Sequence, residues 1–144
     1  MGRVSRFEID LDLSRRMAAA ALQCAVDAGA LVSVAVVDAG GNLVLFERMD
    51  GAEIAGPVLA PDKAFTSVAH RIATHLLTDL VSPGADLAGM NSAASGRYVA
   101  FAGGIPLWDG DRVVGGVGVS GGSGEQDRAA AEAAAAVFTE ASAG

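Results

Sequence analysis

The sequence is poor in several residue types that small proteins use to fix a structure or to carry chemistry. Its 144 residues include one cysteine, Cys24, which excludes an internal disulfide and a zinc site built from several cysteines. Lys63 is the only lysine, and the net charge is −7. Nucleic acids and anionic membrane surfaces bind clustered basic faces, so this composition argues against both kinds of partner.

Long hydrophobic runs and aromatic side chains are also scarce. No apolar run reaches the length of a membrane-spanning helix, and residues 1–12 lack the hydrophobic stretch of a signal peptide, so we expect a cytoplasmic protein. Aromatic residues make up 5% of the chain while hydrophobic residues make up 51%, which predicts a core of small aliphatic side chains in closely packed layers. The length predicts one domain over residues 1–144.

Two hairpin patterns are present. Apolar residues 31–37 and 43–48 flank a turn that begins at Asp38, and a second pair of apolar runs, at 105–107 and 113–119, flanks Asp109-Gly110. An Asp-Gly pair between apolar runs is a strong hairpin signal. Tight hairpins join antiparallel strands and exclude a doubly wound parallel sheet. Residues 98–102 predict a further strand that leads into the second hairpin.

Helical spacing of apolar residues predicts three helices, at residues 13–28, 62–80 and 124–141. Pro57 and Pro61 predict that the middle helix begins at Asp62, which would cap it, while residues 82–96 are typical of a loop. Strands that are apolar on both faces need cover on both faces. The sequence therefore predicts an α+β fold, an antiparallel sheet with helices packed on its faces.

A glycine-rich loop, Ser120-Gly-Gly-Ser-Gly124, precedes the last helix, and Ser123 and Gln126 fit a capping box that opens it. The backbone N–H groups of such a loop, at the positive end of a helix, form a binding site for an anion. Lys63 would follow a helix cap, where its charge is unfavourable unless an anion lies nearby. Together with Arg48, these groups could hold a carboxylate.

Four separated segments carry a resemblance to a known family. They are VVDAGGNLVLFERMDGA (36–52), DKAFTS (62–67), GGIPL (103–107) and DGDRVVGGVGVSGGSGEQDRAAAEAA (109–134). In this order they resemble the GlcG/HbpS-like family, which includes haem-binding HbpS-type proteins and the C-terminal domain of PduO-type cobalamin adenosyltransferases. The resemblance implies a profilin-like antiparallel sheet of about five strands, and homo-oligomers that are often octamers.

The resemblance also implies that the chain is an accessory protein that binds a small molecule, namely haem, a corrinoid or another carboxylate-bearing ligand. Some relatives bind haem through a histidine on the first helix, whereas this helix carries Gln23 and Cys24 and no histidine. His70 is then the candidate haem ligand. The predicted ligand-binding residues are polar residues and glycines of the matched segments: Arg48, Lys63, Thr66, Ser120, Gly121, Gly122 and Ser123.

Two other functions stay open. The chain could be an enzyme that acts on a small carbonyl or carboxylate compound, with Lys63 or His70 as the base and Asp127 or Asp38 orienting it. A turn role alone would also account for Asp38. His70 and His75 are five residues apart, about 140° around a helix, so they cannot share one metal ion on one face. The last alternative is a structural oligomer without catalytic activity.

Overall fold

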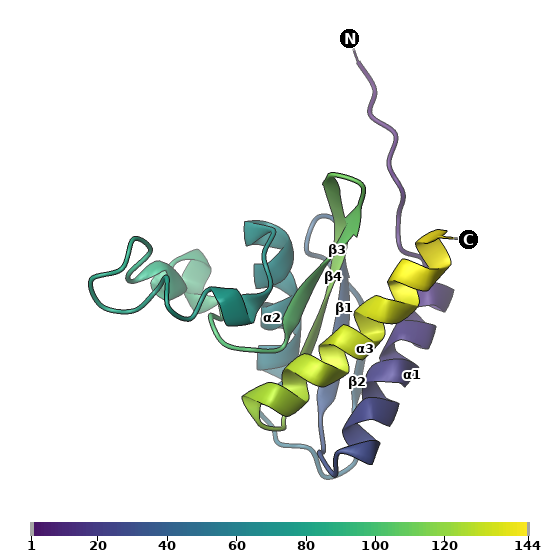
Figure 1. Ribbon diagram of the computed structural model, residues 1–144, viewed down its shortest axis with the longest axis horizontal. Coiled ribbons are helices and arrows are strands. Elements are labelled where there is room, and N and C mark those ends of the chain that lie inside the picture. The colour runs from purple at the N-terminus through teal and green to yellow at the C-terminus, as the bar shows by residue number, and fades with distance from the viewer. Residues whose placement is uncertain (1, 144) are drawn as a thin grey trace.

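The computed structural model describes residues 2–143 and shows an antiparallel sheet between two layers of helices (Figure 1). Its elements are α1 (Leu11–Asp27), β1 (Ser33–Asp38), β2 (Leu43–Arg48), α2 (Gly56–His70), β3 (Gly104–Asp109), β4 (Arg112–Ser120) and α3 (Gly124–Ala143), with short 3-10 helices at Thr74–Leu76, Met90–Ser92 and Ala94–Gly96. The predicted α+β class is confirmed. The sheet has four strands in the order β2-β1-β4-β3, so both predicted hairpins form.

Helices α1 and α3 lie side by side on one face of the sheet (Figure 1). Alternate valines of the central strands, such as Val34 and Val117, point into the core beneath them. The facing surfaces of the two helices are largely alanine, including Ala21 and Ala134, both fully buried. Small side chains let the two helices approach closely, as the composition predicts.

Helix α2 covers the other face, where β4 presents glycines instead of valines. A Cβ at Gly118 would collide with the carbonyl oxygen of Ala60 and would lie 2.7 Å from the backbone nitrogen of Ala64. Gly116 is similarly close to α2, since its Cβ would lie 2.8 Å from the carbonyl oxygen of Ala64. Valine and glycine therefore alternate along β4. The valines pack into the core under α1 and α3, and the glycines let the backbone of α2 approach the backbone of β4 closely.

The predicted limits of the middle helix are wrong at both ends. Helix α2 begins at Gly56, because Pro57 occupies the first turn, where a missing N–H costs nothing, and Pro61 lies inside the helix. It ends at His70, because Arg71 adopts a left-handed conformation with φ of 54°. Asp62 is thus not the cap, and His75 lies outside this helix, in the 3-10 turn Thr74–Leu76.

The predicted strand at residues 98–102 does not form. The backbone N–H of Val99 donates to Oγ1 of Thr66 at 2.9 Å, and the hydroxyl of Thr78 donates to the carbonyl oxygen of Ala100 at 2.7 Å. These side chains take the hydrogen bonds that a neighbouring strand would otherwise satisfy. The predicted loop at 82–96 is confirmed, and with its short 3-10 helices it projects away from the sheet (Figure 1).

Within residues 2–143, no helix combines the length and the apolar character needed to cross a bilayer. The cytoplasmic location and the extent of the domain stay predictions.

Candidate functional site

The only lysine of the chain is buried at one end of the sheet and joins the two helical layers. Lys63 lies on α2 with 1% of its surface exposed, and its Nζ is 3.1 Å from Oδ2 of Asp127, in the first turn of α3. The same ammonium donates to the carbonyl oxygen of Val119 at 2.9 Å. Burial lowers the pKa of Lys63 from its ordinary value, and the charge and hydrogen bond of Asp127 act against this shift.

A glycine lets the lysine reach Asp127. Gly103 has φ of +127°, and a Cβ at this position would lie 3.0 Å from both Cδ and Nζ of Lys63. Any side chain there would block the path of the lysine past the edge of the sheet. The ammonium of Lys63 also faces the ring of Phe101, whose centroid is 5.0 Å from Nζ.

The glycine-rich loop already binds an anion, and that anion belongs to the protein. The N–H of Gly122 donates to Oδ1 of Asp127 at 2.8 Å. The predicted capping box is present, because Ser123 N donates to Gln126 Oε1 at 2.9 Å and Gln126 N donates to Ser123 Oγ at 3.2 Å. The carboxylate of Asp127 therefore occupies the position where the sequence predicts a bound ligand, between Lys63 and the loop.

Two other predicted ligand-binding residues lie near this end of the sheet without joining the pair. Arg48 is exposed at the end of β2. It pairs across the sheet with Ser33 of β1, which in turn pairs with Ser120 of β4. Thr66 is buried on α2, and its hydroxyl donates to the carbonyl oxygen of Asp62 at 2.7 Å while it accepts from the N–H of Val99. Thr66 thus fixes the chain that follows residue 96. The ligand role of these residues, and of Gly121, stays a prediction.

Asp38 lies at the opposite end of β1, where its partner in β4 is Gly115. Its carboxylate accepts from the N–H groups of Gly40 and Asn42, each at 2.9 Å, and so closes the β1–β2 turn. The structure therefore brings Lys63 together with Asp127 and not with Asp38.

His70 packs against the chain segment that α2 anchors. Its ring lies edge-on to Tyr98, with the centroids 4.6 Å apart, and Tyr98 stacks on Phe65 at 5.8 Å. The Nε2 atom of His70 is buried and has no hydrogen-bond partner in the described part of the chain. A buried nitrogen without a partner is costly. Nδ1 of His75 is in the same state, but only His70 also packs against Tyr98, which makes His70 the candidate for an interaction with a ligand.

Sequence reasoning missed a cavity beside this segment. Its volume is about 400 Å³, and we call it the Tyr98 cavity. It lies between α2 and the projecting segment, and its lining is mostly apolar: Leu59, Thr78, Val81, Asn91, Gly96, Tyr98, Val99, Ala100 and Phe101. Phe101 thus has the cavity on one side and the ammonium of Lys63 near its ring. The signal in the sequence was the only tyrosine of the chain, three residues before Phe101, in a run predicted to be a strand.

His75 lies away from both groups, near α3. Burial lowers its pKa, the positive charge of Arg128 lowers it further, and Glu132 acts in the opposite direction. Across residues 2–143, no three histidine, cysteine, aspartate or glutamate side chains are grouped so that they could hold a metal ion.

Comparison with known proteins adds three findings. The family model described as "Haem degrading protein HbpS-like" matches residues 9–136. An uncharacterized 15.0 kDa protein in the dhaT-dhaS intergenic region of Citrobacter freundii is 42% identical over 132 residues, which cover 92% of this chain and 93% of that protein. The corrinoid adenosyltransferase PduO of Salmonella typhimurium is 46% identical over 107 residues, 74% of this chain, but these are only 32% of PduO.

A solved structure shares the fold. The crystal structure of a PduOC:heme complex superposes with a TM-score of 0.88 at 40% identity, over 91% of this chain and 95% of that one. The chain therefore resembles the part of PduO that this complex contains and spans about a third of the whole enzyme.

The buried pair predicts a large loss of stability when only one partner is removed. Lys63→Met leaves the Asp127 carboxylate buried without a counter-charge, so we expect the free energy of unfolding in urea to fall by about 3–5 kcal/mol. The double variant Lys63→Met/Asp127→Asn should be more stable than this single variant, because no unpaired charge remains. Arg16→Met, which breaks an exposed pair with Asp12, is the control and should cost less than about 1 kcal/mol. If Lys63→Met and Arg16→Met lowered the free energy of unfolding equally, a structural role for Lys63 would be contradicted.

The lysine also has a measurable titration of its own. Because Lys63 is the only lysine, its side chain gives one set of NMR signals, and we expect their midpoint below that of a free lysine, since burial disfavours the charged form. Asp127→Asn removes the charge that raises the pKa, so the midpoint should move further down. A midpoint that stays at the ordinary value in both proteins would show that the ammonium is hydrated.

Proposed function

The chain belongs to the HbpS-like family, and from this premise we propose that it binds haem, with the Tyr98 cavity as the binding site. The observation that carries the proposal is the cavity itself, an apolar space of about 400 Å³. A largely apolar wall with a few polar groups is the usual composition of a small-molecule site. The haem complex of a relative that shares the fold supports the choice of ligand.

The side chains around the cavity fit haem in two respects. Leu59, Val81 and Phe101 offer apolar contact to a porphyrin, and the phenol of Tyr98 is of a type that can ligate haem iron. His70 lies against Tyr98 on the side of α2, with a nitrogen that has no partner in the described chain. When bound, haem would supply a redox-active iron, which no side chain of the site provides.

In this proposal the haem iron would be held by the phenol of Tyr98 or by the imidazole of His70. Tyr98 lines the cavity directly. His70, the ligand expected from the sequence, does not line the cavity but packs against Tyr98. The first helix offers no histidine, so ligation here differs from that of relatives that use one. The predicted role of Arg48 and Lys63 in holding a ligand carboxylate stays a prediction, because neither residue lines the cavity.

An enzyme that acts on a small carbonyl or carboxylate compound is the second candidate. One observation favours it: burial lowers the pKa of Lys63, which increases the fraction of neutral amine available as a base or nucleophile. Phe101 separates the amine from the Tyr98 cavity, so substrate access would require this half-exposed ring to move. Asp127 would orient the lysine.

We also propose that the protein acts as a homo-oligomer, an octamer. Large apolar side chains are exposed just before and within the first turn of α2, where Ile54 is 88% and Val58 62% exposed. Light scattering should then give a mass of several times the 14.3 kDa of one chain, and Ile54→Asp should reduce it. Val26→Asp, an exposed apolar position on α1, should leave the mass unchanged. A monomer mass for the unaltered chain would rule out the oligomer.

A haemin titration tests the proposed function. We expect a saturable change in the Soret band of the visible spectrum, with affinity reduced at least about tenfold in Tyr98→Phe, because this variant lacks the oxygen that would ligate the iron. His70→Ala should weaken binding or change the spectrum through its contact with Tyr98. His75→Gln is the control and should bind haemin normally, because His75 neither lines the cavity nor stacks on Tyr98, whereas His70 packs against that ring.

Each outcome of the titration has a consequence. Loss in Tyr98→Phe with retention in His70→Ala assigns the iron to the phenol, and the reverse assigns it to the imidazole. Normal binding in both variants would place haem elsewhere on the protein. The absence of saturable binding would remove haem as the ligand and leave the enzyme with Lys63 as its base.

A further inference from the structure

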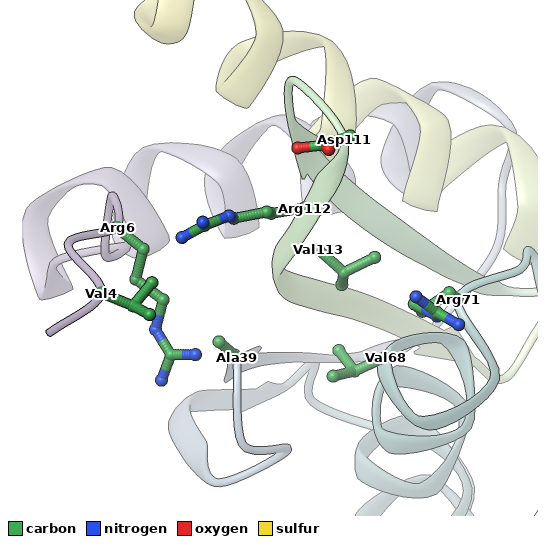
Figure 2. Close-up of a pocket in the computed structure, with 8 residues that line it drawn as sticks. All are labelled: Val4, Arg6, Ala39, Val68, Arg71, Asp111, Arg112 and Val113. Atoms are coloured by element: carbon green, nitrogen blue, oxygen red, sulfur yellow. The ribbon is translucent and has the colours of Figure 1, made fainter. Parts of the chain in front are cut away.

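A second cavity lies at the other end of the sheet from Lys63, and none of the predicted site residues lines it. Its volume is about 380 Å³, and we call it the arginine cavity (Figure 2). Its walls come from the chain before α1, the end of β1, the C-terminal turn of α2 and the beginning of β4. Segments that are distant in the sequence therefore build one concave surface.

The lining of the arginine cavity carries an excess of positive charge. Arg6, Arg71 and Arg112 all contribute to it, against a single carboxylate, that of Asp111. None of these three arginines takes part in an ion pair within residues 2–143, although the chain as a whole has a net charge of −7. Unpaired positive charge concentrated in a cavity of an acidic protein indicates an anionic ligand.

The charges are arranged at two sides of an apolar floor. Arg6 and Arg112 lie on one side in Figure 2, and Arg71 lies on the other. Val68 and Val113 lie between them, with Ala39 beside them. A ligand that satisfies this surface has a negative group at each end and a short apolar segment in the middle.

The positions of Arg71 and Arg112 are both fixed by the backbone. Arg71 occupies the left-handed position that ends α2, where glycine is the usual residue, so its side chain leaves the helix at the rim of the cavity. Nη1 of Arg112 donates to the carbonyl oxygen of Ser5 at 3.1 Å, which holds the N-terminal segment with Arg6 against the beginning of β4.

We propose that the arginine cavity binds an aliphatic dicarboxylate. One carboxylate lies between Arg6 and Arg112, the methylene groups contact Val68 and Val113, and the second carboxylate pairs with Arg71. The planar guanidinium group forms paired hydrogen bonds with a carboxylate, so arginine suits this ligand better than lysine does. The site is separate from the Tyr98 cavity and does not depend on haem binding.

Calorimetric titration of the full chain with glutarate tests the proposal. We expect saturable binding that weakens with rising salt concentration, and at least about a tenfold loss of affinity in Arg71→Gln and in Arg112→Gln, the effect of one charge-assisted contact. Arg15→Gln, an exposed arginine of α1, is the matched control and should bind glutarate normally. Butyrate, with one carboxylate, should bind at least about tenfold more weakly than glutarate for the same reason.

A second measurement does not depend on the variants. Because Arg6 forms part of the wall, glutarate should slow tryptic cleavage after Arg6 and leave cleavage after the exposed Arg15 unchanged. Phosphate that binds as tightly as glutarate would overturn the dicarboxylate assignment in favour of a compact anion. Equal affinities for glutarate in Arg71→Gln and Arg15→Gln, or no binding at millimolar concentration, would overturn the site.

Discussion

The buried ion pair of Lys63 and Asp127 is the constraint on which much of this structure depends. It is the one described ion pair in which both side chains are almost fully buried, and it ties α2, on one face of the sheet, to α3 on the other. Two buried charges are stable only when each is fully hydrogen-bonded. The carbonyl of Val119 and the N–H of Gly122 supply these further bonds, so the end of β4 and the loop before α3 have to adopt one conformation.

The same pair also shapes the candidate site. Lys63 requires a glycine at position 103, and Phe101, two residues earlier, closes over the ammonium and forms a wall of the Tyr98 cavity. Thr66, one turn further along α2, fixes Val99 in the same segment. The segment from 97 to 103 therefore takes its conformation from α2 rather than from a neighbouring strand, and this leaves the cavity between the segment and the loop that projects from the sheet.

Local chemistry explains which parts could be predicted from the sequence. The hairpins, the limits of β2 and the capping box of α3 depend on neighbouring residues, and the structure confirms all three. The C-terminal end of α2 could not be predicted, because Arg71 adopts a left-handed conformation that glycine usually adopts. The partner of Lys63 could be predicted only in part. The sequence correctly indicated an anion near Lys63, but this anion is the carboxylate of Asp127, which is 64 residues away in the chain.

The burial of the only lysine has a consequence for the surface. Every exposed side chain with a permanent positive charge carries a guanidinium group, because the only lysine is buried. A guanidinium, unlike an ammonium group, is not deprotonated in proteins. Acetylation, methylation and conjugation at lysine have no accessible side-chain amine to modify. Neither alkaline pH nor the common lysine modifications therefore remove positive side-chain charge from the exterior.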